Sequence, residues 1–410
     1  MPAGIAAGTD TIYLPRADID ALISVLRDQG YLVVGPTVRD GVISLQPIQS
    51  AADLPHGVAD EQGAGHYRLR EGDSALSFRY VVGPDGPKRW FFPPTLHLFR
   101  LRTTPDDLVI EDCSDDPPRL AILGIRPCDV AALLSLDRVF GSPDTGTFRC
   151  EIDTYYRSAR KMAFLAAVNC THPGSNCFCT SMGTGPVVQE GADLALTELR
   201  GGFLLQAGSE RGIEVLRALP GREPSPAELE LAELRLQSAA ASMGKHLETE
   251  GLAERLAVTG EHPHWDEVAK RCLGCGNCTQ VCPTCFCSSV VDSTDLAGDS
   301  ATRTRLWESC FTHQFSYTTA GHVRSSIRSR YRHWLNHKLG TYRSQFGVDG
   351  CVGCGRCITW CPVGIDLTAE AAALQDGPHR SSAVDMGHSL GGGRWRRRPE
   401  APALRQLCHG

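Results

Sequence analysis

Eight of the eighteen cysteines stand in two copies of one short pattern. Residues 272–283 read CLGCGNCTQVCP and residues 351–362 read CVGCGRCITWCP, so both copies have the form C-x₂-C-x₂-C-x₃-C-P. This run is the ligand pattern of bacterial [4Fe–4S] clusters, in which the fourth cysteine ligates the other cluster. Glycines inside each run allow the loop to wrap closely around inorganic sulfide. The repeat therefore predicts two [4Fe–4S] clusters.

The pattern also predicts which thiolates hold each cluster. We expect one cluster on Cys272, Cys275, Cys278 and Cys361, and the other on Cys351, Cys354, Cys357 and Cys282. Zinc prefers two separated C-x₂-C pairs. Disulfides do not suit the cytoplasm, where we place the chain because its first residues do not read as a secretory signal. Residues 283–350 separate the two runs by far more than the linker of a usual ferredoxin, which leaves the crossover of Cys282 and Cys361 open.

Four further cysteines follow two apolar runs in the first half of the chain. Residues 120–125 (LAILGI) and 163–168 (AFLAAV) read as buried strands with a helix over residues 130–139 between them. This order favours parallel strands whose carboxyl-terminal loops are neighbours. Those loops would bring together Cys128, Cys170, Cys177 and Cys179. Four thiolates suit a third [4Fe–4S] cluster, and zinc would fit the same ligands; the two clusters already predicted favour iron–sulfur.

The remaining cysteines and histidines give weaker signals. Cys285, Cys287 and Cys310 lie near the first run, and could replace a ligand, help hold an additional cluster or simply pack beside a cofactor. His172 is expected to be structural, and a substitute ligand is the alternative. No metal-type spacing surrounds Cys113, Cys150 and Cys408.

Catalytic motifs are missing from the sequence. It contains neither a dinucleotide fingerprint nor a phosphate-binding loop, and we assign no catalytic residue. The stretch 323–348 is basic and has no Asp or Glu; it reads as a solvated helix, a docking face for an acidic subunit, or a positive field that raises the potential of a nearby cluster.

Composition and patterning indicate how these residues are positioned. The chain of 410 residues is 42% hydrophobic with a net charge of −6, which argues against a nucleic-acid partner. No apolar run reaches the roughly 18–20 residues that span a membrane. We expect an α/β domain over residues 1–258, with helices at 18–29 and within 227–256, the latter broken near Gly251. A small α+β ferredoxin-like dicluster domain (259–370) with a helical insertion (288–346) would follow, and then a disordered tail (371–410).

Several longer motifs together resemble one protein family. They are LGIRPCDVAAL, NCTHPGSNCFCTSMGTGP, CTQVCPTCFC, RLWESCF, RYRHWLNHKLG and CVGCGRCITWCPVGID, which span roughly residues 75–368. The chain resembles the iron–sulfur β subunit of cytosolic NAD(P)-linked [NiFe] hydrogenases (sulfhydrogenases). It is also similar to the A subunit of anaerobic sulfite reductase.

The resemblance implies an electron-transfer subunit of a soluble complex, itself non-catalytic. Such a subunit passes electrons between a flavin (FAD) subunit that binds NAD(P) and the hydrogenase small subunit, which serves the [NiFe] large subunit. It also implies that the eight motif cysteines and the Cys128, Cys170, Cys177 and Cys179 set are ligands. The sulfite reductase protein remains an alternative, as does a structural scaffold whose clusters transfer no electrons.

Overall fold

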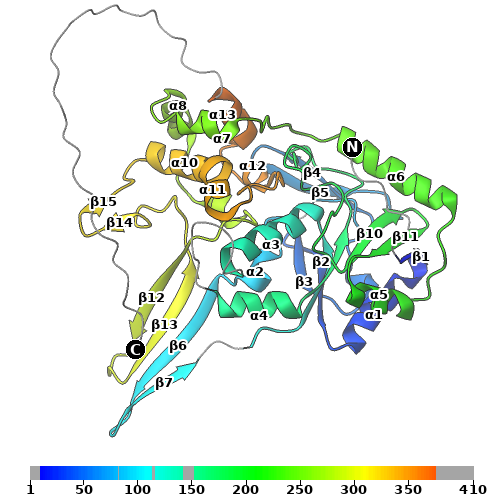
Figure 1. The fold of residues 1–410 in the computed structure, drawn as a ribbon, viewed down its shortest axis with the longest axis horizontal. Coiled ribbons are helices and arrows are strands. Elements are labelled where there is room, and N and C mark those ends of the chain that lie inside the picture. The colour runs from blue at the N-terminus through cyan, green and yellow to red at the C-terminus, as the bar shows by residue number, and fades with distance from the viewer. Residues whose placement is uncertain (1–9, 82, 113–115, 142–151, 375–410) are drawn as a thin grey trace, which may run out of the picture. The chain divides into compact units, whose positions relative to one another are not determined.

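The computed structural model describes residues 10–81, 83–112, 116–141 and 152–374 of the chain (Figure 1). A seven-stranded sheet organises the first part of the protein. The strand order is β1-β11-β10-β9-β8-β2-β3. These strands are β1 (Thr11–Pro15), β2 (Leu32–Arg39), β3 (Val42–Pro47), β8 (Leu120–Ile125), β9 (Phe164–Val168), β10 (Leu194–Leu199) and β11 (Gly202–Ala207). Strand β8 pairs in parallel with both β2 and β9, and β9 pairs in parallel with β10. The predicted parallel neighbours β8 and β9 are therefore confirmed.

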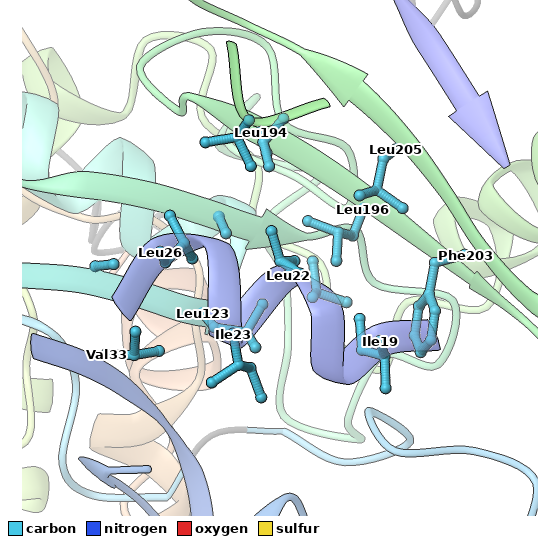
Figure 2. Close-up of a cluster of buried hydrophobic side chains, with 14 of the residues drawn as sticks. Ile19, Leu22, Ile23, Leu26, Val33, Leu123, Leu194, Leu196, Phe203 and Leu205 are labelled. Atoms are coloured by element: carbon cyan, nitrogen blue, oxygen red, sulfur yellow. The ribbon is translucent and has the colours of Figure 1, made fainter. Parts of the chain in front are cut away.

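Helices cover both faces of this sheet. They are α1 (Ile19–Asp28) and α5 (Glu210–Ala218) on one face, and α2 (Lys88–Phe91), α3 (Pro127–Phe140) and α4 (Thr154–Met162) on the other. Leu123 of β8 packs toward α1, and the adjacent Ile122 packs toward α3. Figure 2 shows Leu22, Ile23 and Leu26 of α1 packed against the sheet. Burial on both faces explains why β8 and β9 are continuous apolar runs.

The other helices predicted for the first domain are present as well. The helix predicted at 18–29 is α1, and the one predicted at 130–139 lies within α3. The segment 227–256 contains α6 (Pro226–Ala241) and α7 (Leu252–Ala257). Gly251, the predicted break, is the residue before α7 and has a left-handed φ of 62°.

A second sheet corrects the prediction of a helical insertion at 288–346. Its order is β12-β13-β6-β7, formed by β6 (Thr95–Thr103), β7 (Leu108–Asp112), β12 (Ser288–Thr294) and β13 (Ser300–Trp307). Only the later part of the insertion is helical, as α10 (Ile327–Asn336), a π-helical turn η3 (His337–Thr341) and α11 (Tyr342–Phe346). The first part contains Val290, Val291 and several threonines, which suit strands. It also finds a distant partner, since β13 pairs with β6.

Short elements complete the described chain. They are η1 (Arg16–Asp18), η2 (Ala51–Asp53), β4 (Val58–Gly63), β5 (His66–Glu71), α8 (His264–Arg271), α9 (Asn277–Gln280), β14 (Tyr317–Thr318), β15 (Gly321–His322), α12 (Arg356–Thr359) and α13 (Leu367–Ala373). Residues 371–373 were predicted to belong to a disordered tail, but they form the end of α13; residues 375–410, the rest of the predicted tail, lie outside the described ranges. Of the helices in the described ranges, none is long and apolar enough to cross a bilayer.

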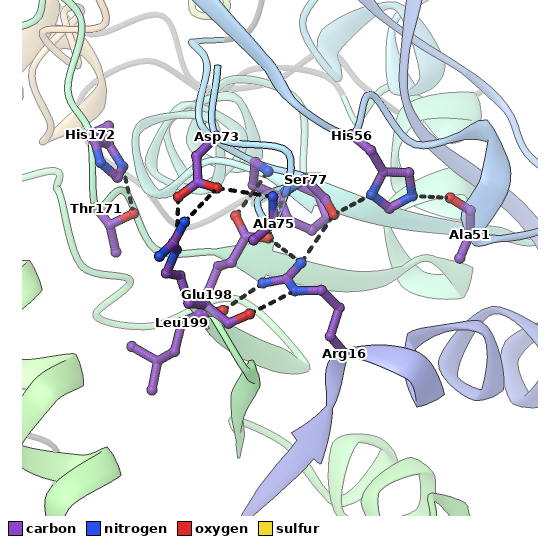
Figure 3. Close-up of polar contacts among 12 residues, drawn as sticks. Arg16, Ala51, His56, Asp73, Ala75, Ser77, Thr171, His172, Glu198 and Leu199 are labelled. Atoms are coloured by element: carbon purple, nitrogen blue, oxygen red, sulfur yellow. Dashed lines mark hydrogen bonds and ion pairs between the residues drawn. The ribbon is translucent and has the colours of Figure 1, made fainter. Parts of the chain in front are cut away.

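A buried carboxylate fastens the segment 73–81 to the sheet (Figure 3). Glu198 of β10 accepts backbone N–H bonds from Ser77 at 2.7 Å and Phe78 at 2.9 Å, and it pairs with Arg16 at 2.9 Å. Ionised hydrogen bonds of this kind are stronger than neutral ones. The network therefore holds in place the carbonyl groups of Phe78 and Tyr80, which Arg126 binds.

Candidate iron–sulfur centres

Each cysteine motif folds as a tight loop followed by one helical turn. Gly274 and Gly353 occupy matching positions, and both have a left-handed φ of 64°. In each loop this glycine donates its N–H to the first cysteine Sγ at 3.4 Å, Gly274 to Cys272 and Gly353 to Cys351. Helices α9 and α12 then follow at the same offset. The sequence repeat is therefore a structural repeat.

The two loops differ in what they touch. A Cβ on Gly353 would lie 2.5 Å from the Phe178 carbonyl oxygen, whereas the nearest atom to a Cβ on Gly274 belongs to the Ile327 side chain, 3.7 Å away. Phe178 also donates its N–H to the Gly353 carbonyl at 2.8 Å. The second loop is thus packed directly on the cysteine-bearing loop that follows β9.

We expect Gly353→Ala to destabilise the protein more than Gly274→Ala. Both variants carry the left-handed cost of about 1–2 kcal/mol, but only the first pushes against a backbone. The two can be compared by denaturant midpoint and iron retention after anaerobic purification. Equal midpoint shifts would show that the close approach at Gly353 does not matter to stability.

The first group of thiols surrounds a small apolar cavity. Its walls include Cys272, Cys275, Cys278, Cys361 and Cys357, together with aromatic side chains from α10 and the segment before it. Burial raises the pKa of Cys278 well above its ordinary value, and the neighbouring charges of Cys272, Cys361 and Cys275 add to it. Cys361 of the second motif therefore lies among the first three cysteines of the first motif.

The second group shows the reciprocal arrangement. Burial raises the pKa of Cys357 well above its ordinary value, and the charges of Cys351, Cys354 and Cys282 raise it further. Cys282 of the first motif thus lies among the first three cysteines of the second. Metal ligation requires the thiolate, so a cluster bound here would displace the protons that burial favours. The arrangement is the one expected for crossed ligation, and the ligand assignment itself stays a prediction.

Lys338 lies beside the second group. It stands on the π-helical turn η3, and its ammonium group donates to Cys282 Sγ at 3.1 Å and to the Gly350 carbonyl at 3.0 Å. Burial opposes its charge, but the negative charges of Cys282, Cys285 and Cys351 outweigh burial and raise the pKa of Lys338 well above its ordinary value. Of the three interpretations of the basic stretch 323–348, a positive field at a cluster is the one that Lys338 fits.

The third group lies where the parallel strands end. One cavity is lined by Cys128 at the start of α3, by Cys170 just after β9, and by Cys177 and Cys179 from the same loop. Burial is the main cause that raises the pKa of Cys177 to about 12. The strand order thus brings together the four thiols that the sequence suggested. Carboxyl ends of parallel strands are the usual place for such sites.

A buried arginine forms one wall of this third cavity. Arg126 directly follows β8, is 3% exposed, and donates to the carbonyls of Phe78 and Tyr80 at 2.7 Å each. Its Nε is buried without a hydrogen-bond partner. Burial raises the pKa of Cys170, and the charge of Arg126 and its hydrogen bond to this thiol act against that rise. The donor set therefore suits an anionic, thiolate-rich centre.

An ion pair joins the second and third groups. Asp129 accepts two bonds from Arg356, at 2.6 and 2.9 Å, and both side chains are buried. Cys354 of the second group also lines the third cavity, and Cys177 Sγ lies 3.9 Å from the Cys354 carbonyl oxygen. The three groups of thiols consequently form a continuous series.

The thiol geometry also bears on zinc. Among the described residues, no three His, Cys, Asp or Glu side chains converge on one ion position. A tetrahedral zinc site needs its ligands within about 2.0–2.3 Å of one point. A cubane takes each thiolate at a separate corner, so its ligands need not meet at one point.

The remaining sequence candidates divide between the described and undescribed residues. Cys285, Cys287 and Cys310 line a separate cavity next to Lys338. His172 bonds to the adjacent Thr171 hydroxyl at 3.0 Å and does not line the third cavity, as expected for a structural residue. The cysteines expected to be ordinary, Cys113, Cys150 and Cys408, lie outside the described residues.

Sequence reasoning gave no individual role to the buried cations. Arg126, Lys88 and Arg356 are each at most 5% exposed and lie near cysteines. A local signal existed for Arg126, which stands between a fully apolar strand and Cys128, and for Arg356, which stands inside the second cysteine motif. Lys88 is recognisable only once the fold has placed it.

Comparisons with known proteins agree with this geometry. A family described as "4Fe-4S dicluster domain" matches residues 271–365. The chain is also similar to "Sulfhydrogenase 2 subunit beta" of Pyrococcus furiosus, with 32% identity over 316 residues that cover 76% of this chain and 90% of that protein. No solved structure is significantly similar.

Proposed function

The chain belongs to the sulfhydrogenase β-subunit family, and we propose that it is the electron-transfer iron–sulfur subunit of a multi-subunit [NiFe] hydrogenase. The observation that carries the proposal is the continuous series of three thiol groups, in which Cys354 belongs to the second group and borders the third. A series of neighbouring centres is what one-electron transfer through a protein requires.

In this proposal the three groups hold one [4Fe–4S] cluster each, and the dicluster part is ferredoxin-like. Such clusters supply reversible one-electron chemistry at potentials set by charge, hydrogen bonds to sulfur and burial. Cys272, Cys275, Cys278 and Cys361 hold the first, Cys351, Cys354, Cys357 and Cys282 the second, and Cys128, Cys170, Cys177 and Cys179 the third.

The chain's own residues prepare these sites in distinct ways. Gly274 and Gly353 donate their N–H groups to the sulfurs of Cys272 and Cys351, and Lys338 places its positive charge beside the sulfur of Cys282. Aromatic side chains such as Phe311 and Trp334 wall the first cavity against water. Positive charge and N–H donors favour the reduced cluster, while apolar walls preserve these interactions by keeping the local dielectric low.

The partners follow from the family resemblance. A flavin subunit that binds NAD(P) would exchange electrons at one end of the series, and the hydrogenase small subunit, which serves the [NiFe] large subunit, at the other. We place the complex in the cytoplasm, where reducing conditions keep thiols available as cluster ligands.

The test is anaerobic purification of the native complex. We expect about twelve irons per copy of this chain from three clusters, together with flavin, nickel and hydrogen-dependent dye reduction. About eight irons would remove the third cluster. Sirohaem with sulfite-dependent activity would identify the A subunit of a sulfite reductase instead. Clusters that do not reduce reversibly, with no flavin-bearing partner, would identify a structural scaffold.

A further inference from the structure

A cavity of about 450 Å³ lies beside the cysteine groups and is not used by the proposed clusters. The groups that line it and can do chemistry are Cys285, Cys287, Cys310, His333, His337 and Lys338. Aromatic side chains supply most of the remaining wall, and among the described lining residues there is no carboxylate. The cavity therefore combines soft sulfur and nitrogen groups with positive charge.

Two of these thiols are held together by the base of the β12–β13 hairpin. Cys287 immediately precedes β12, and Cys310 follows shortly after β13. Glu308 donates its N–H to the Cys287 carbonyl at 2.9 Å, which continues the pairing of the two strands beyond their ends. The Cys310 thiol is a hydrogen-bond partner of Cys287.

The position of the pair separates it from the three ligand groups. Cys287 and Cys310 stand on the two sides of the hairpin base and line the same cavity, away from the cavities of the cysteine motifs. Cys285 is the hydrogen-bond partner of Cys282, so it does not complete a third corner around the pair. Two thiols at the base of one hairpin suit a bond between two sulfurs.

The surroundings also activate one of the two sulfurs. Hydrogen bonding from Cys310 is the main cause that lowers the pKa of Cys287, and the charges of Lys338 and Lys88 contribute. The thiolate is the reactive form in thiol–disulfide chemistry, so Cys287 is the more reactive of the two sulfurs.

We propose that Cys287 and Cys310 form a redox-active dithiol that exchanges an electron pair with the two clusters of the cysteine motifs. This inference rests on the proposed function, because those clusters are its electron partners. Cys278, assigned to the first cluster, is close enough to influence Cys310 by charge, and Lys338 bridges from the cavity to Cys282 of the second.

The exchange balances as follows. On reduction the S–S bond breaks, one electron arrives from each of two reduced clusters, two protons enter from the cavity, and two thiols result. On oxidation two S–H bonds break and the S–S bond forms, one electron goes to each oxidised cluster, and two protons leave. Ferredoxin-type clusters have lower potentials than catalytic disulfides, so reduced clusters drive the reaction toward the dithiol.

The test compares thiol labelling in the native complex at two poised potentials, after acid quench, unfolding and alkylation under anaerobic conditions. Trypsin separates Cys310 from the first motif, and chymotrypsin separates Cys285 from Cys287 by cleavage after Phe286. In the oxidised sample we expect Cys287 and Cys310 to lose alkylation together and to appear as one cross-linked peptide. In the reduced sample both should be alkylated. Persistent alkylation of both thiols at all potentials would overturn the inference.

Variants separate this inference from the proposed function. Cys310→Ser should retain wild-type iron and sulfide but accept about two electrons fewer per chain in a reductive titration, since a disulfide is a two-electron couple. Cys285→Ser is the matched control and should keep both the iron and the cross-link. Loss of about four irons from Cys310→Ser would instead make Cys310 a cluster ligand. Wild-type complex that lacks iron altogether would overturn the proposed function, and with it the electron partners of the dithiol, whereas iron-loaded complex without the cross-link would overturn this inference alone.

Discussion

Cys361→Ala is expected to remove the same cluster as Cys278→Ala, although the two residues belong to different motifs. The reason is the crossed arrangement, in which Cys361 lies with Cys272, Cys275 and Cys278. Each variant should lose about four irons per chain and the same reduced-state paramagnetic resonance signal. Electron transfer through the complex should fall to background, because one centre of the series is missing.

The matched comparison is Cys351→Ala, from the same motif as Cys361. Under crossed ligation its spectrum should differ from that of Cys361→Ala and agree with that of Cys282→Ala. If Cys361→Ala and Cys351→Ala instead lose the same signal, each motif holds its own cluster and the crossed assignment is wrong. Iron analysis and spectra of the anaerobically purified complexes decide between these outcomes.

Asp129→Ala should be among the most destabilising single substitutions in the protein. Arg356 is buried and uses both terminal nitrogens on Asp129, so removal of the carboxylate leaves an uncompensated charge in the interior. Loss of one partner of a buried ion pair costs about 3–5 kcal/mol. We expect a matching fall in the stability of the iron-loaded protein, measured by denaturant unfolding under anaerobic conditions.

An exposed pair of the same chemistry provides the control. Arg303 binds Asp292 through two bonds of 2.7 Å, but its side chain is 44% exposed and that of Asp292 is 58% exposed. Surface ion pairs contribute about 0–1 kcal/mol, so Asp292→Ala should be nearly silent. The double variant Asp129→Leu with Arg356→Met should recover part of the lost stability, because apolar residues can replace both charges. Equal effects of Asp129→Ala and Asp292→Ala would contradict this account.

The buried ion pair between Asp129 and Arg356 also connects two of the proposed cluster sites. Asp129 follows Cys128 of the third group, and Arg356 lies between Cys354 and Cys357 of the second. An interaction that crosses 227 positions of sequence thereby fixes the relative placement of two proposed clusters.

What the sequence by itself determined is the chemistry and the local geometry that spacing encodes. Two runs of C-x₂-C-x₂-C-x₃-C-P dictate two equivalent loops, because a short glycine-bearing turn has few ways to place three thiols on one side. The apolar runs of β8 and β9 likewise indicate buried parallel strands, and this pattern alone predicts that Cys128 lies near Cys170.

Tertiary structure alone decided the contacts that no local pattern encodes. Residues 288–346 were expected to form a helical insertion, but they begin with the paired strands β12 and β13. Strand β13 also pairs with β6, which lies about two hundred residues earlier in the chain. Lys338 was expected as one member of a basic stretch, yet the π-helical turn buries its charge against Cys282. Cys287 and Cys310 had no spacing that linked them until the hairpin closed. Each of these features depends on the burial of a charge or the pairing of distant strands, and long-range packing determines both.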